Sequence, residues 1–481
     1  MVSLLLTSFY SIWLYASYLR LETYGVLALA LTFMMYMPWL DGGFRTVLSR
    51  AILAAEDPEK RFELLQFGQR IYTFLSILII LGNLLLMVVY GLTPSTKQEG
   101  ISIFFFLFLG IANGLQAAAL IQWGVFVGAQ RQSGLFILQA LGAWLSVNVL
   151  AWSFARGWNI WSIPIANLVT FAVTYPLSLR WIKKSFPKLK IFDWTITPQF
   201  KENFRKYKTE AWFCFRSQIT TVVLYSSDIL IIGYFCPKGE VAVYYMIIRL
   251  IGMLRSLLQT GGEVGWPFLA QRGGAKEDVA LPWFGLHGWI YGAVAGALTV
   301  VTIPFCAWFM GPEWTVPHAL LWAVVLRFMI VGLGSSATYL LYAVAAFRPI
   351  SKSLETELVL GLILGTVGAY FWGVIGVAVG FLAATIGGTL LPVFLAFARS
   401  ASVPLWRILG RVWSRTILGF LGSYFTASIL LRVWTAGIYT PAIGAVAVGA
   451  SLLLALGLAI SRSGIPTNFE TRQLRQLLQK V

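Results

Sequence analysis

Residues 70–91, RIYTFLSILIILGNLLLMVVYG, decide the fold class of this chain. They form an apolar run of about 20 residues, the length at which a helix crosses the hydrocarbon core of a bilayer. Comparable runs recur along the whole sequence, some fourteen in all. We therefore predict an all-α polytopic membrane protein with spans at approximately 2–19, 25–45, 70–91, 101–127, 134–154, 160–181, 209–235, 240–270, 284–310, 316–345, 352–371, 373–398, 412–433 and 438–461.

The 36 Lys and Arg residues fall almost entirely into alternate gaps between these spans. The positive-inside rule then places the even-numbered gaps and both termini in the cytoplasm, in the inner (plasma) membrane of the cell. The odd-numbered gaps are short, so no folded part is expected outside, and the function lies within the membrane. They contain Arg20, Lys97, Arg156 and Lys238, and Arg432 lies at the end of span thirteen beside such a gap.

The composition agrees with this class, because 58% of the residues are hydrophobic and only 11% are charged. The net charge of +17 reflects the cytoplasmic loops and suits anionic lipid headgroups, so we expect membrane lipids and no nucleic acid as partners. Three cysteines, Cys214, Cys236 and Cys306, lack paired spacing. Neither a disulfide framework nor a metal site is indicated, and no cofactor is expected.

A basic stretch at 182–208 divides the first twelve spans into two halves. We predict an N-terminal six-helix lobe at 1–181, a cytoplasmic linker at 182–208 and a C-terminal six-helix lobe at 209–398. Two additional spans lie at 399–461, and an amphipathic cytoplasmic tail follows at 462–481. A repeat after six spans keeps its orientation, which predicts two lobes related by a pseudo-two-fold axis along the membrane normal.

Glycines at a spacing of four mark spans eleven and twelve. Gly361 and Gly365 are followed by Gly376 and Gly380. Small residues at this spacing let helices approach closely, so we expect tight packing between these two spans rather than a hinge.

Ionisable residues inside spans are costly and mark candidate function. In span eight, Arg255, Gln259 and Glu263 form one helical stripe, while Arg249 lies about 120° away from it. Span seven adds Arg216 and Asp228, and span ten adds Arg327. Arg249 and Arg255 lie too deep to reach the surface and favour a water-filled cavity, whereas Arg216 and Asp228 are explained equally well by salt bridges between helices. Asp41 and Arg45, spaced i,i+4 at the end of span two, form either an ordinary intrahelical pair or a coupling and gating site.

Motifs for the commoner enzyme chemistries are missing. The sequence contains no GxxxxGK[ST], HExxH or GxSxG pattern, which argues against ATP hydrolysis, zinc proteolysis and α/β-hydrolase catalysis. Membrane glycosyltransferases would need a substantial outer loop. Transport remains as the predicted function, and we do not expect this protein to be an enzyme.

Several short stretches resemble a known superfamily. The run Thr23-Tyr-Gly25-Val-Leu-Ala followed by Leu40-Asp-Gly-Gly-Phe-Arg45 resembles the start of polysaccharide and lipid-linked oligosaccharide flippases, O-antigen flippases among them. These proteins belong to the multidrug/oligosaccharidyl-lipid/polysaccharide (MOP) exporter superfamily. The later runs Ser227-Asp-Ile-Leu-Ile-Ile-Gly233, Val243-Tyr-Tyr-Met-Ile-Ile-Arg249 and Trp266-Pro-Phe-Leu resemble its seventh and eighth helices.

This resemblance implies a monomer with two six-helix lobes, a central cavity and alternating access. The implied substrate is a glycan on a polyprenyl diphosphate, moved to the outer leaflet, with polysaccharide assembly proteins as further partners. The arginines of span eight would suit a diphosphate. The alternative is a cation-coupled multidrug exporter of the same superfamily, which would rely on buried acidic groups. A third hypothesis is a scaffold in the cell envelope that transports nothing.

Overall fold

The computed structural model describes residues 2–35, 42–44, 47–48, 51–52, 57–93, 101–122, 132–190, 195–271, 277–311, 314–343, 346–401 and 403–435. The expected last span, 438–461, and the tail, 462–481, lie outside these residues. The described residues contain no strand, which confirms the all-α fold class.

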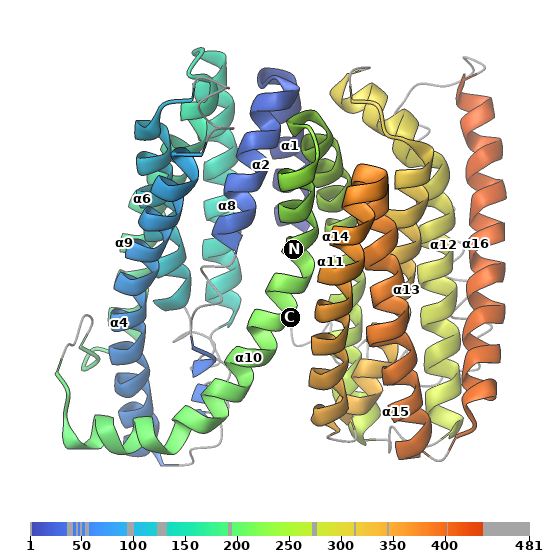
Figure 1. The fold of residues 1–481 in the computed structure, drawn as a ribbon. Helices are drawn as coiled ribbons and strands as arrows, with labels where there is room; N and C mark the ends of the chain where they lie inside the picture. Colours follow the sequence, from blue (N-terminus) through green and yellow to red (C-terminus); the bar gives the residue numbers. More distant parts are fainter. Residues whose placement is uncertain are drawn as a thin grey trace. The chain divides into compact units, whose positions relative to one another are not determined.

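The chain forms two compact units, Met1–Met246 and Ile247–Val481, which are described separately. In each unit the long helices run side by side (Figure 1). The first unit contains α1 (Val2–Tyr18), α2 (Leu21–Met35), α4 (Pro58–Gly91), α6 (Ile103–Gln122), α8 (Gln132–Ala155), the short 3-10 helix η2 (Asn159–Trp161), α9 (Ser162–Ser185), α10 (Pro198–Phe235) and the start of α11 (Lys238–Gln271). The second continues α11 and adds α12 (Glu277–Met310), α13 (His318–Ala343), α14 (Phe347–Thr385), the π-helix η3 (Ile386–Leu390), α15 (Leu391–Ala401) and α16 (Leu405–Thr435).

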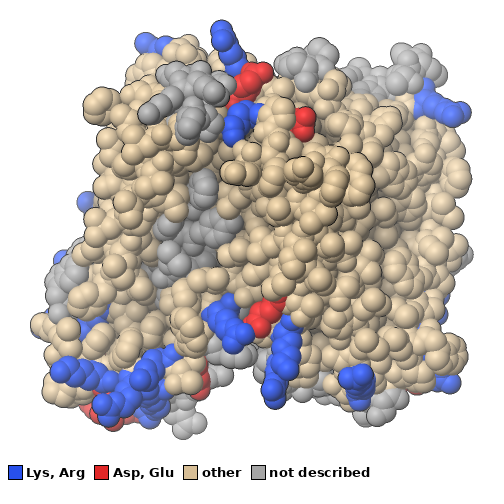
Figure 2. Space-filling view, viewed as in Figure 1, with Lys and Arg blue, Asp and Glu red and all other residues tan. Residues whose placement is uncertain are grey.

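Each of the first thirteen expected spans overlaps one of these helices, and spans eleven and twelve share α14. By length and composition, 7 of the described segments are apolar enough to cross a membrane. One of them, Arg348–Ala401, is 54 residues long and holds two of the expected spans. On the face drawn in Figure 2, charged side chains gather mainly toward the upper and lower ends, as a bilayer-spanning surface requires.

The expected linker at 182–208 is partly helical. α10 begins at Pro198, after Thr197, whose side chain accepts a hydrogen bond from the Phe200 amide. The aromatic ring of Phe200 packs on Phe67 of α4, and Asn203 donates to the Glu63 carboxylate across 2.8 Å. Figure 1 shows these first turns of α10 crossing the end of α4 before the helix turns along its span. The basic segment is therefore fixed to α4.

A break inside α14 separates spans eleven and twelve where we expected it. Trp372 and Gly373 have non-helical dihedrals, and Gly373 has a φ of 57°, in the region that favours glycine. The two halves then pack closely. A Cβ at Gly376 would lie 2.0 Å from the Gly368 carbonyl oxygen, and one at Gly380 would lie 2.4 Å from the Leu364 oxygen. The glycine packing prediction is confirmed, and Gly368 joins the set.

A second glycine contact, which the sequence analysis did not single out, joins α12 to α16. Gly288, Gly292 and Gly296 follow one another at a spacing of four along α12. A Cβ at Gly292 would lie 2.2 Å from the Thr416 carbonyl oxygen, and one at Gly296 would lie 2.3 Å from the Phe420 oxygen. The two backbones touch along this stripe, so the second unit depends on it.

Candidate functional site

Asp228 of α10 is a buried carboxylate held by two donors. Asp228 is only 1% exposed. One oxygen accepts a hydrogen bond from the Tyr244 hydroxyl at 2.8 Å, and the other accepts from the Ile229 amide at 2.8 Å. The short turn between α10 and α11 brings Tyr244 back alongside Asp228. A buried carboxylate without such donors would be strongly destabilising, so this pair anchors the start of α11.

Three of the sequence stretches that resemble flippases meet at this same turn. A Cβ at Gly25 would lie 2.0 Å from the Lys238 carbonyl oxygen, so only glycine lets α2 approach the start of α11. A Cβ at Gly233 would lie 2.3 Å from the Leu29 side chain. The Tyr24 ring packs edge-on against Tyr245. The Tyr-Gly pattern and the Ser-Asp pattern are therefore two sides of one helix contact within the first unit.

Cys236 lies in this turn, next to the first residues of α11. Burial, together with the charge and hydrogen bonding of the Glu240 carboxylate, raises the pKa of its thiol to about 11. The thiol is therefore neutral at ordinary pH, and its reactive thiolate is populated only as the pH rises toward that value.

We expect a membrane-impermeant maleimide to label Cys236 from outside the cell, slowly near neutral pH and faster as the pH is raised. Glu240→Gln should lower the pKa and speed labelling several-fold at a fixed pH. The measurement uses intact cells carrying a variant in which Cys214 and Cys306 are serine. Labelling that requires permeabilised cells would contradict the outward position, and an unchanged rate in the Gln variant would contradict the effect of Glu240.

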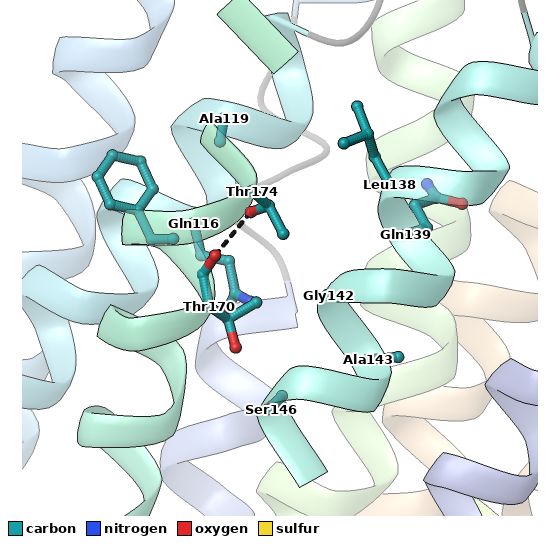
Figure 3. A pocket seen from close by; sticks show the side chains of 10 residues that line it. Gln116, Ala119, Leu138, Gln139, Gly142, Ala143, Ser146, Thr170 and Thr174 are labelled. Carbon is teal, nitrogen blue, oxygen red and sulfur yellow. Dashed lines mark hydrogen bonds between the residues drawn. The ribbon is translucent and has the colours of Figure 1, made fainter. Parts of the chain in front are cut away.

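A cavity of about 350 Å³ lies between α6, α8 and α9 of the first unit (Figure 3). In the figure, Thr170 and Thr174 of α9 lie across the cavity from α8, and the Thr174 hydroxyl donates to the Thr170 carbonyl at 2.8 Å. Within the described part of the chain, the buried Thr170 hydroxyl has no hydrogen-bond partner. The described lining contains hydroxyls, amides and one ring but no charged side chain: Gln116, Ala119, Leu138, Gln139, Gly142, Ala143, Ser146, Thr170, Phe171 and Thr174.

The second unit holds Arg249, Arg255, Gln259 and Arg327. The Gln259 amide donates to the Ser335 hydroxyl of α13, and its backbone oxygen accepts from Tyr339 at 2.9 Å. Arg255 lies one turn before Gln259 on α11 and is partly buried. Arg327 of α13 is 7% exposed, and its guanidinium lies 4.8 Å from the centre of the Phe381 ring. A cation over an aromatic face keeps its charge within an apolar setting.

The structure also reveals a buried carboxylate that the sequence analysis passed over. Glu357 of α14 is 1% exposed and accepts hydrogen bonds from the Thr385 and Thr389 hydroxyls. Both threonines border or belong to η3, and Gly388 between them lies against the Glu357 backbone. The sequence signal was an acidic residue followed by an unbroken apolar run, but its hydroxyl partners lie 28 and 32 residues further on.

For the remaining predicted site residues, the structure gives fewer contacts or none. Arg216 is exposed on α10 of the first unit. Asp41 and Arg45 lie outside the described residues, as does the side chain of Glu263. Because Arg216 and Asp228 belong to one unit and the other four to the second, a single shared cavity stays a prediction. No group of three metal-ligating side chains occurs among the residues that the structure describes.

Solved structures similar to this chain include transporters of the MOP superfamily and a lipid flippase. An inward-facing multidrug resistance MATE family transporter is 13% identical, with a TM-score of 0.67, covering 82% of this chain and 94% of its own. The lipid II flippase MurJ, in an inward closed conformation, is 14% identical, with a TM-score of 0.67 and coverages of 95% and 96%. A MOP superfamily transporter from Pyrococcus furiosus is 13% identical, with a TM-score of 0.51 and coverages of 83% and 95%. At such identities the similarity shows the fold.

Sequence comparison identifies the family. No curated protein sequence matches this chain. Residues 2–271, more than half of the chain, match the family model described as polysaccharide biosynthesis protein. The match includes the turn at which Gly25, Asp228 and Tyr244 meet. Because this match covers more than half of the chain, the chain belongs to the polysaccharide biosynthesis protein family.

Proposed function

We propose that this protein is a flippase that moves a polyprenyl-diphosphate-linked oligosaccharide from the cytoplasmic to the outer leaflet by alternating access. The family match supports polysaccharide biosynthesis as its setting. The fold shared with a lipid II flippase supports transport of a lipid-linked head group. The plasma membrane, with both termini in the cytoplasm, is the location that the distribution of basic residues favours.

The observation that carries this proposal is the cavity of the first unit, whose described lining combines hydroxyls and amides with apolar side chains and carries no charge. Sugars are bound by amides and hydroxyls together with an aromatic ring, and this cavity offers Gln116, Thr170 and Phe171 for such contacts. Its volume of about 350 Å³ lies within the range of small-molecule sites. A cavity built for organic cations would need a carboxylate, and the described lining contains none.

In the proposed mechanism the arginines of the second unit neutralise the diphosphate. Arg249 and Arg255 would form charge-assisted, bidentate hydrogen bonds to phosphate oxygens, with Arg327 and Arg216 adding positive potential. Gln259 and Glu263 would border this site. Asp41, Arg45 and Asp228 are the candidates for coupling or gating. The prenyl chain stays in lipid, so the protein needs to enclose only the head group.

The alternative is a cation-coupled multidrug exporter, and the buried carboxylates Asp228 and Glu357 favour it. The two functions differ in the charge of their cargo. Arginines in the proposed transport cavity would repel organic cations and attract an anionic head group, because a low-dielectric wall strengthens both effects.

Deleting the gene is expected to leave efflux of cationic dyes unchanged while surface polysaccharide is lost and lipid-linked glycan accumulates in the cytoplasmic leaflet. Both quantities are measured on one deletion strain and on the same strain carrying the gene on a plasmid. Lost efflux with intact polysaccharide would move the assignment to the multidrug exporter, with Asp228 and Glu357 as the residues to test. Loss of neither would favour a scaffold without transport.

A further inference from the structure

A second cavity, of about 710 Å³, lies in the second unit where α14 begins and α15 ends. The described residues that line it include three cations and no acidic side chain. Arg348 and Lys352 come from the first turns of α14, and Arg399 comes from the last turn of α15. Pro349, Pro392 and Leu395 form apolar parts of the wall.

The positive charge of this cleft is concentrated. Arg348, Lys352 and Arg399 are all exposed, and like charges in one cleft repel one another unless an anion lies between them. α14 begins here, and the residue before it makes no side-chain cap hydrogen bond. The dipole of this helix start adds to the attraction for an anion.

Exposed apolar side chains lie on the same helix faces as Lys352 and Arg399. From Lys352, the same face of α14 continues to Val359 and Ile363, which are 56% and 55% exposed. From Arg399, the face of α15 continues backward at a spacing of four to Leu395 and Leu391, which are 39% and 43% exposed. In a membrane-spanning protein, exposed apolar residues of this kind contact lipid chains.

We propose that this cleft binds the phosphate headgroup of an anionic phospholipid. Arg348, Lys352 and Arg399 hold the phosphate, and the acyl chains lie along the apolar faces that begin at Val359 and Leu395. The continuity of charge with lipid-facing residues favours a phosphate carried by a lipid over free phosphate in solution. The basic residues of the neighbouring gaps assign this end to the cytoplasmic leaflet. The site is separate from the proposed transport cavity and does not depend on the flippase assignment.

Native mass spectrometry of the full chain in detergent, titrated with phosphatidylglycerol and with phosphatidylcholine, tests this site. The wild-type protein is expected to retain phosphatidylglycerol in preference to phosphatidylcholine. The triple variant R348Q/K352Q/R399Q should retain phosphatidylglycerol at least about tenfold more weakly. The matched control K183Q/K184Q/K188Q removes three exposed cations elsewhere and should bind as the wild type does.

Three outcomes would overturn the proposal. The first is equal phosphatidylglycerol binding by the triple variant and the wild type, and the second is equal weakening by the control. In the third, a competitor displaces phosphatidylglycerol at a concentration below that at which phosphatidylglycerol binds. If the competitor is inorganic pyrophosphate, the cleft binds free phosphates. If it is a polyprenyl diphosphate, the cleft binds the transported carrier. If the triple variant does not fold, the three single variants are tested instead. Each is expected to bind phosphatidylglycerol about fivefold more weakly than the wild type.

Discussion

Replacing Arg249 and Arg255 together with alanine is expected to reduce glycan export roughly a hundredfold while leaving the amount of protein in the membrane unchanged. Hydrogen bonds to charged groups are worth about 1.5–3 kcal/mol each, and the double change removes two such donors from the diphosphate. Both residues are partly buried on α11 rather than enclosed in its core.

Lysine at both positions should restore only part of the export, because an ammonium lacks the planar fork that binds two phosphate oxygens at once. Ser256→Ala, at the exposed residue beside Arg255, is the matched control and should export normally. Surface polysaccharide is quantified against membrane protein level for each variant. Normal export by the double alanine variant would refute the diphosphate role, and full rescue by lysine would refute the bidentate contact.

Gly292→Val is expected to prevent most of the protein from folding. A Cβ here would lie 2.2 Å from the Thr416 carbonyl oxygen and 3.0 Å from its Cα, both backbone atoms that cannot rotate away. Separating α12 from α16 to make room would also open the contacts at Gly288 and Gly296. Overpacking typically costs about 1–3 kcal/mol and here exceeds that range, since two helix backbones must separate.

The matched control is Gly422→Val on α16, where a Cβ would meet nothing within 4 Å. Both substitutions add the same atoms to a glycine in the same helix pair, so their difference isolates the close contact. Fluorescence-detected size exclusion of a fusion protein after heating measures the fraction that stays folded. Equal thermal midpoints for the two variants would show that α12 and α16 do not touch as described.

Spans and membrane orientation could be predicted from the sequence because hydropathy and charge are local properties. Runs of about 20 apolar residues specify helices wherever the chain enters a bilayer, since every backbone group must be satisfied within the segment. The same reasoning located the break between spans eleven and twelve, which the structure places at Trp372 and Gly373. It did not indicate that the last eleven residues of the expected linker, 198–208, already belong to α10, where Phe200 packs on Phe67 of α4 and Phe204 packs on Phe44.

Which helices pack against each other could be predicted from the sequence only in part. Gly376 and Gly380 could be assigned to packing because their neighbour in sequence is also their neighbour in space. The stripe of Gly288, Gly292 and Gly296 has the same spacing, but its partner α16 begins more than a hundred residues later. Spacing shows that a helix has a small-residue face, and it does not show which helix covers that face.

The sequence by itself determined the class of protein, the positions of its helices and which charges lie inside them. Only the tertiary structure decided what those charges touch. Asp228 meets Tyr244, Arg327 lies over Phe381, and the overlooked Glu357 is held by Thr385 and Thr389. The physical reason is that the cost of burying a charge depends on local hydropathy, which the sequence contains, whereas the donors that offset this cost come from helices far along the chain and are chosen by packing.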